Sequence, residues 1–308
     1  IEAIKSGRVG YFGIDVYERG EKAADYAKRH GVARWYDNAD ALIADPEVNA
    51  VYVATPPGSH LEYALKVAEA GKPCYVEKPM ARTFEECQKM VSAFVEKDLP
   101  LYVAYYRRRL PLFEKVKELL AEEAVGEVRY VNLQLQQAPK SSDLSGEANW
   151  RVDPSIAGGG YFFDLASHQL DLLDYLLGPI NEVHGISTNQ AGLYQAEDAV
   201  VAAFEFASGA VATGNWNFSV APEASQDLLE IVGNTGKIRF STFADHPLEL
   251  ITSAGHQHWN FQNPEHIQSG LLETVIADLR GTGECPSTGR SAARTNWVMG
   301  EMVQEEEE

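Results

Sequence analysis

The sequence predicts an α/β protein in two parts: a parallel sheet with helices on both faces, then an α+β part with a large, mostly antiparallel open sheet. Over the first hundred residues, short apolar strands alternate with helical segments, which is typical of βαβ units. Past Tyr106 this alternation stops, and from residue 182 onward strand follows strand, separated by turn signals such as ASGA and GNTG. We therefore predict two domains, 1–104 and 105–308.

The first part contains a repeating order of elements. The expected strands are 8–16, 50–55, 73–79 and 100–105, and the expected helices are 20–31, 59–71 and 83–98. The last three strands are apolar throughout, which favours a parallel sheet that is buried on both faces. For the helix 59–71 we expect Ser59 as the N-cap and Gly71 as the C-cap.

The second part begins with a helix over 111–123, a strand over 126–137 and a leucine-rich helix over 158–178. The strands expected after them, forming an antiparallel meander, are 182–190, 197–209, 210–220, 227–243 and 248–255. Residues 199–218 carry apolar and aromatic side chains at both alternations, more than one core face needs. We expect helices on one sheet face and a second subunit on the other, hence a homo-oligomer.

Composition limits the classes of partner. The net charge of −19 argues against nucleic acid and against an anionic membrane surface, because both would repel the chain. No apolar run approaches the roughly 18 residues of a membrane span, and no secretory signal opens the chain. Three cysteines without a CxxC pair predict reduced thiols in a cytoplasmic protein. The terminal EEEE is expected to be disordered.

Two strand ends in the first part carry polar residues. In open parallel sheets ligands bind beyond the carboxyl ends of the strands. One strand there ends in TPPGSH (55–60), and the next ends in Glu77, Lys78 and Pro79. Lys78 is placed to polarise a substrate oxygen. Because the chain must turn directly after the strand to aim this side chain, we predict a cis peptide between Lys78 and Pro79.

The leucine-rich helix carries a polar stripe behind the glycines 158–160. Asp164, His168 and Asp171 are four and three residues apart, so on an α-helix they share one face. One interpretation is a solvated surface stripe. The other is a functional face, on which His168 converges with Lys78 at one site.

Several segments together resemble the glucose–fructose oxidoreductase and inositol dehydrogenase family, Gfo/Idh/MocA. They are EVNAVYVATPPGSHLEYALKVAEAGKPCYVEKPMA, AYYRRRLPLF, WRVDPSIAGGGYFFDLASHQLDLLDYLLGP and PSTGRSAARTNWVM, in that order. The resemblance implies a Rossmann domain for NAD or NADP and a second domain whose sheet builds a dimer or tetramer. It also implies hydride transfer between nicotinamide and a secondary alcohol of a sugar, cyclitol or related polyol.

The resemblance assigns roles to residues. Lys78, Asp164 and His168 would be catalytic: His168 takes the hydroxyl proton, Lys78 stabilises the oxygen, and Asp164 orients the substrate or tunes the histidine. Asp171 would be a supporting partner or a surface residue, and the glycines would let the backbone approach the ligands closely. The expected cofactor contacts in this region are Thr55, Pro56, Pro57, His60, Glu77 and Lys78. The expected substrate contacts are Tyr106, Arg107, Trp150, Arg151, Asp164 and His168.

Two departures from simple expectations concern the substrate and a metal. Tyr106 stands where the family commonly has asparagine, which puts the usual sugar contacts in doubt. Arg151 could bind a carboxylate or a polyol, or pair with one of the acidic residues. His256, His258 and His266 match no metal-site spacing, so we expect no metal.

The start of the chain departs from the family. A GxGxxG turn should follow the first Rossmann strand, but neither that strand nor the glycine loop is found, and residues 1–18 resemble a D-2-hydroxyacid dehydrogenase segment. The ribose-binding acid is Asp15 or Glu18, and Arg19 could favour NADP over NAD. We expect either that further residues precede this chain or that it binds dinucleotide poorly. A non-catalytic dinucleotide- or sugar-binding regulator, or an engineered or truncated chimera, is the alternative to an enzyme.

Overall fold

The structure is a computed structural model that describes residues 21–303. The strand expected over 8–16 and the candidate cofactor residues Asp15, Glu18 and Arg19 lie outside the described residues. So does the terminal EEEE.

A three-stranded parallel sheet forms the core of the first part, in the order β1-β2-β3. The strands are β1 (Val51–Val53), β2 (Cys74–Val76) and β3 (Leu101–Val103). All residues of β2 and β3 are buried, as expected for a parallel sheet covered on both faces. The predicted strands of this region are confirmed, although each is shorter than its apolar run.

Helices of the first part are α2 (Glu21–His30), α3 (Ala39–Ala44), α4 (His60–Glu69) and α5 (Phe84–Glu96). The short helix η1 (Pro57–Ser59) leads into α4. The sequence analysis missed α3. Its N-cap residue Asn38 accepts hydrogen bonds from the backbone N–H groups of Asp40 and Ala41. Ser59 does not cap α4 as predicted: its hydroxyl donates to Thr55 Oγ1 at 2.7 Å instead.

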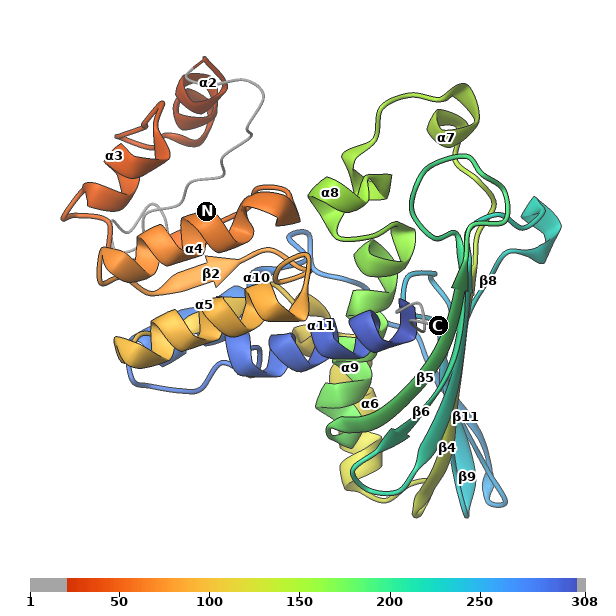
Figure 1. The fold of residues 1–308 in the computed structure, drawn as a ribbon. Helices are drawn as coiled ribbons and strands as arrows, with labels where there is room; N and C mark the ends of the chain where they lie inside the picture. Colours follow the sequence, from red (N-terminus) through yellow and green to blue (C-terminus); the bar gives the residue numbers. More distant parts are fainter. Residues whose placement is uncertain (1–20, 304–308) are drawn as a thin grey trace.

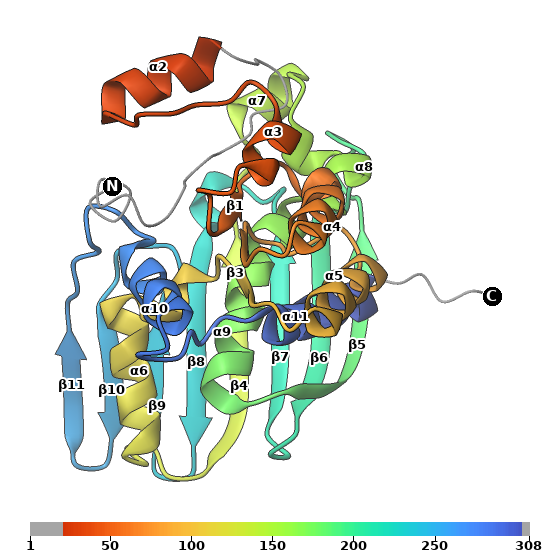
Figure 2. The same ribbon diagram turned by 90° about the vertical axis from the view of Figure 1, so that its left-hand side faces the viewer.

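The second part contains an eight-stranded sheet in the order β11-β10-β9-β8-β4-β7-β6-β5 (Figure 2). Its strands are β4 (Val128–Gln136), β5 (Ile180–Thr188), β6 (Ala199–Phe206), β7 (Val211–Asn217), β8 (Gln226–Gly233), β9 (Gly236–Phe240), β10 (Leu248–Thr252) and β11 (Gly255–Trp259). The predicted simple meander is wrong, because β4 lies between β7 and β8. It pairs parallel with β7 and antiparallel with β8.

Longer helices cover one face of this sheet (Figure 1). They are α6 (Pro111–Ala121), α9 (Ser167–Leu177) and α11 (Gly289–Val303), whereas α10 (Ser269–Leu279) packs against Tyr75 and Tyr102 of the parallel sheet. The shorter helical segments are η2 (Tyr106–Arg109), α7 (Ser141–Ser145), η3 (Trp150–Val152), α8 (Pro154–Ala157), the π-helix η4 (Phe162–Ala166) and η5 (Pro222–Ala224). No helix of the described residues covers the opposite face of the sheet.

Helix α11 joins the two parts. Its residues Ala292 and Ala293 belong to the core around the parallel sheet, whereas Val298, Met299 and Met302 belong to the core of the large sheet. The end of the chain therefore returns to the first part, and the domain boundary at residue 104 stays a prediction.

Two ion pairs hold α9, and the first of them is fully buried. Arg108 of η2 binds Asp171 through Nε at 2.8 Å and Nη2 at 2.6 Å, and both residues are buried. One turn further, Asp174 accepts two hydrogen bonds from Arg294 of α11, at 2.8 and 2.6 Å. Asp171 is thus buried, which excludes the alternative that it is a surface residue.

We expect Arg108→Ala to lower the free energy of unfolding by about 3–5 kcal/mol, because the Asp171 carboxylate would stay buried without its partner. The double variant Arg108→Met, Asp171→Leu should lose less, since it leaves no unpaired buried charge. Urea denaturation monitored by tryptophan fluorescence measures both. A double variant at least as unstable as Arg108→Ala would contradict this account.

Candidate active site

Two loops meet at the carboxyl end of the parallel sheet, and the buried His60 ring joins them. Its Nε2 lies 2.6 Å from the carbonyl oxygen of Thr55, and its Nδ1 lies 3.1 Å from that of Pro79 and 3.2 Å from that of Met80. The peptide between Lys78 and Pro79 is cis, which confirms that prediction. His60, expected as a cofactor contact, has both ring nitrogens engaged by the protein and connects the strand ends.

Lys78 reaches from the end of β2 to the helical segment before α9. Its Nζ donates to Asp164 Oδ1 at 2.6 Å and to the Asp164 carbonyl oxygen at 2.7 Å. An ammonium carries three N–H donors, so one is left for another acceptor. The side chain is 13% exposed. Two of the three predicted catalytic residues are therefore in direct contact.

His168, the third, lies in the first turn of α9 and is buried. The rings of Tyr105, Tyr106 and Phe243 surround it, with centroids 5.1 to 6.1 Å from its own. Burial holds the pKa of His168 well below its usual value, and the charges of Lys78 and Arg107 lower it further. Its Nδ1 is buried and has no hydrogen-bond partner among residues 21–303. The imidazole is thus neutral at pH 7 and able to accept a proton.

The predicted stripe of three residues does not form one functional face. Asp164 lies in the π-helical segment η4 and His168 in α9, whereas Asp171 is committed to Arg108. A π-helical turn has a wider hydrogen-bonding ring than an α-helix, so α-helical spacing does not describe this stretch. Lys78 pairs with Asp164, and its charge acts on His168.

Close packing within the protein requires the three glycines 158–160. A Cβ on Gly158, which has φ +87°, would lie 2.6 Å from the carbonyl oxygen of Arg82, and one on Gly159 would lie 2.1 Å from the Phe163 ring. A Cβ on Gly160 would lie 2.8 Å from the carbonyl oxygen of Glu197. Their approach to a ligand stays a prediction.

Two further cations lie around Asp164. Arg151 Nε is 3.5 Å from Asp164 Oδ2, and its guanidinium lies 4.3 Å from the centroid of the Trp150 ring. Lys140, which the sequence analysis missed, has its Nζ 3.8 Å from the centroid of the Tyr161 ring. Burial lowers the pKa of Lys140, while the charge of Asp164 raises it. No sequence motif indicates Lys140, because only the folding of the chain brings it near Asp164.

Arg107 and Tyr106 lie on the other side of His168. Arg107 is 9% exposed, donates from Nη1 to the carbonyl oxygen of Thr242 at 2.8 Å, and stacks over the Phe243 ring at 4.5 Å. Asp227 stabilises the loop that contains Thr242 and Phe243. It accepts hydrogen bonds from the backbone N–H groups of Thr242, Phe243 and Ala244. The sequence analysis missed Asp227 and Phe243, which follow His168 by 59 and 75 residues in the chain.

The remaining predicted cofactor contacts lie at the same sheet edge. Thr55 and Pro57 are buried and Pro56 is half-buried. Glu77 accepts from the Tyr52 hydroxyl and, at 2.7 Å, from Gln268 Nε2 of the segment before α10. The contacts of Glu77 support the strand ends. Contact of these residues with a cofactor stays a prediction.

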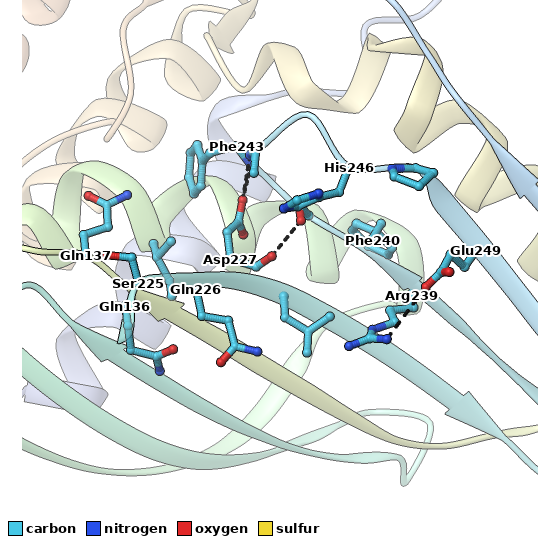
Figure 3. A pocket seen from close by; sticks show the side chains of 15 residues that line it. Gln136, Gln137, Ser225, Gln226, Asp227, Arg239, Phe240, Phe243, His246 and Glu249 are labelled. Carbon is cyan, nitrogen blue, oxygen red and sulfur yellow. Dashed lines mark hydrogen bonds and ion pairs between the residues drawn. The ribbon is translucent and has the colours of Figure 1, made fainter. Parts of the chain in front are cut away.

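A cavity of about 700 Å³ opens at one end of the large sheet (Figure 3). Phe243 and Asp227 line it, whereas Lys78, Asp164 and His168 do not. Of the three histidines considered as metal ligands, His256 pairs with Glu249 at 3.1 Å. Among residues 21–303, no group of three His, Cys, Asp or Glu side chains is placed to hold a metal ion.

The fold and this arrangement define a class: an oxidoreductase with an NAD-binding parallel-sheet domain and a second domain with an open sheet. Comparison with known proteins agrees. Residues 13–105 match the oxidoreductase family with an NAD-binding Rossmann fold, and residues 113–239 match the Gfo/Idh/MocA C-terminal domain. The chain belongs to the Gfo/Idh/MocA oxidoreductase family.

Curated relatives support the family. Oxidoreductase P35 of Formosa agariphila is 35% identical over 93% of this chain and 88% of its own. The levoglucosan dehydrogenase of Pseudarthrobacter phenanthrenivorans is 31% identical over 72% of this chain and 62% of its own. The scyllo-inositol 2-dehydrogenase (NAD(+)) of Bacillus subtilis is 25% identical over 89% and 78%.

Solved structures show the same fold. A levoglucosan dehydrogenase in complex with NADH superposes with a TM-score of 0.83 and 25% identity, covering 95% of this chain and 86% of that one. The WlbA dehydrogenase from Bordetella pertussis, in complex with NADH and UDP-GlcNAcA, superposes with a TM-score of 0.76 and 27% identity, covering 92% and 85%. The predicted fold class and family are confirmed.

Proposed function

We propose that this oxidoreductase transfers hydride between NAD and a secondary alcohol of a sugar, cyclitol or related polyol, with Lys78, Asp164 and His168 as its catalytic residues. The observation that carries the proposal is the contact of Lys78 Nζ with Asp164 Oδ1 beside a buried, neutral His168. Relatives named as dehydrogenases of levoglucosan and scyllo-inositol support the substrate class.

The residues at this sheet edge fit the nicotinamide end of the cofactor. Lys78 stands at the carboxyl end of β2, where ligands of parallel sheets bind, and His168 Nδ1 is buried without a protein partner. When bound, NAD supplies the hydride acceptor for the carbinol carbon. Thr55, Pro56, Pro57 and Glu77 of the strand ends would line its binding site.

The protein's part in the reaction is proton transfer and stabilisation of the oxygen. The remaining N–H of Lys78 donates to the substrate hydroxyl oxygen, which favours the developing negative charge. His168 accepts the hydroxyl proton as the carbon loses hydride, so a ketone, a reduced cofactor and a protonated imidazole result. Asp164 orients the Lys78 ammonium. Tyr106 and Arg107 flank the imidazole, and Trp150 and Arg151 flank Asp164.

Oligomer formation is part of the proposal. The uncovered sheet face exposes Tyr130, Ile186, Val201 and Val211, and Tyr130 is the cross-strand partner of Val211. Apolar side chains on one open face favour a contact with a second copy of the chain. We also propose a cytoplasmic location, supported by three buried cysteine thiols without a disulfide among the described residues. No helix within residues 21–303 is long and apolar enough to cross a membrane.

Lys78→Met and His168→Gln should each lower kcat by about 10²–10⁴ on any alcohol that the enzyme oxidises, because each removes a group that acts on the reacting hydroxyl. NADH binding, followed by fluorescence, should persist in both. Lys97→Met and His266→Gln, at exposed positions outside the site, are the matched controls. Full activity of either site variant would contradict the assigned roles.

The pH profile of oxidation tests the state of His168. Because its pKa lies below the usual value, kcat/KM should stay constant as the pH falls to about 6.5 and decrease only below that. Arg107→Gln removes a nearby positive charge, so the acid limb should move to higher pH. A wild-type limb centred at or above pH 6.5 would be inconsistent with a buried histidine base.

The double variant Val201→Lys, Val211→Lys should dissociate the oligomer, because it places charges on the uncovered sheet face. Light scattering coupled to size-exclusion chromatography measures the mass, which for the wild type should be a multiple of one chain. Leu65→Lys, on an exposed position of α4, is the control. A monomeric wild type would contradict the expected assembly.

A further inference from the structure

One carboxylate in the site is shared by several cations. Asp164 Oδ1 lies 2.6 Å from Lys78 Nζ, and Oδ2 lies 3.5 Å from Arg151 Nε. The charge of Asp164 also acts on Lys140. In a chain with a net charge of −19, such a group of cations around one carboxylate is a local feature.

The nearest other carboxylate is engaged elsewhere. Asp143 Oδ1 accepts from the Tyr161 hydroxyl at 2.8 Å, and Oδ2 accepts from the backbone N–H of Lys140 at 3.1 Å. It attracts the Lys140 ammonium through space, but no ion pair joins the two within the described residues. Lys140 and Arg151 therefore keep hydrogen-bond donors that this part of the protein does not use.

Arg107 adds a buried positive charge on the far side of His168. Its guanidinium has no ion-pair partner among residues 21–303: Nη1 donates to a backbone carbonyl, and Nε is buried with no hydrogen-bond partner. Asp227 is close enough to act on it, yet its oxygens accept from three backbone N–H groups. Arg107 thus keeps one N–H donor that the described residues leave unpaired.

The exposed cations and the reacting groups lie on two sides of Asp164. Lys78, on Oδ1, is nearly buried and adjoins His168, whereas Arg151, on Oδ2, is 45% exposed and lies against the Trp150 ring. The Asp164 carboxyl group alone separates Lys78 from Arg151. A single sugar molecule is long enough to contact both cations. A planar guanidinium beside an aromatic ring is well suited to bind a carboxylate.

We infer that the substrate is an acidic sugar or polyol, whose carboxylate binds Arg151 and Lys140 while its reacting hydroxyl lies at Lys78 and His168. The inference rests on the proposed function for the identity of the reacting groups. Binding of the acid group, however, is measurable without turnover.

Thermal stabilisation of the cofactor-free and NADH-loaded protein tests the inference. The probes are D-galacturonate and D-glucuronate, each compared with its uncharged parent, galactose or glucose. At least one acid should raise Tm where its parent does not, and increasing salt should weaken the effect. Arg151→Gln and Lys140→Gln should each raise the Kd for that acid about tenfold to a hundredfold. The exposed-site variants Arg290→Gln and Lys97→Gln should leave it unchanged.

The outcomes separate the two proposals. Equal stabilisation by an acid and its parent, no stabilisation by either acid, or an unchanged Kd in Arg151→Gln would overturn the inference. An acid that binds through Arg151 but yields no NADH with NAD would support the carboxylate-binding part of the inference and count against the proposed function. Where the acid is oxidised, Arg151→Gln should raise KM with little change in kcat, because the carboxylate does not react.

Discussion

The arrangement of the site depends on the ion pair between Lys78 and Asp164. It connects the loop after β2 to the π-helical segment before α9, two places 86 residues apart in the chain. The Lys78 ammonium contacts both the carboxylate and the carbonyl oxygen of Asp164, so its direction is determined by two acceptors. A lysine side chain on its own has many rotamers, and this double contact selects the one that keeps its charge beside His168.

Each partner of this ion pair is supported by buried polar contacts. On the sheet side, His60 holds together the two loops at the carboxyl ends of β1 and β2. On the helix side, the pairs Arg108–Asp171 and Arg294–Asp174 connect α9 to η2 and α11. Because α11 packs against both cores, a displacement of the large sheet would also move the helix that carries His168. The relative position of the two parts therefore determines the geometry of the reacting groups.

Sequence reasoning identified the residues that we propose to react, but not the residues that support them. Lys78 after a buried strand and His168 on an apolar helix are local patterns, and the family resemblance depends on the same residues. Lys140, Phe243 and the partner of Asp171 are brought near by pairings between distant segments, which no local pattern encodes. The place of β4 between β7 and β8 is of the same kind: its sequence predicts a strand but not its neighbours. The π-helical segment was missed because it has the composition of an α-helix.

The site also retains polar atoms that the protein itself leaves unpaired. His168 Nδ1 and Arg107 Nε are both buried and have no hydrogen-bond partner in the described part of the chain, and the two residues interact electrostatically. Such an atom costs roughly 1–3 kcal/mol of stability when nothing satisfies it. The next residue of the same helix, Gln169, forms its side-chain hydrogen bonds within the protein. It accepts from Trp216 Nε1 at 2.8 Å and donates to Thr242 Oγ1 at 3.2 Å. The neighbouring residues of α9 thus differ in kind, since Gln169 stabilises the fold while His168 keeps hydrogen-bonding capacity that the fold does not use.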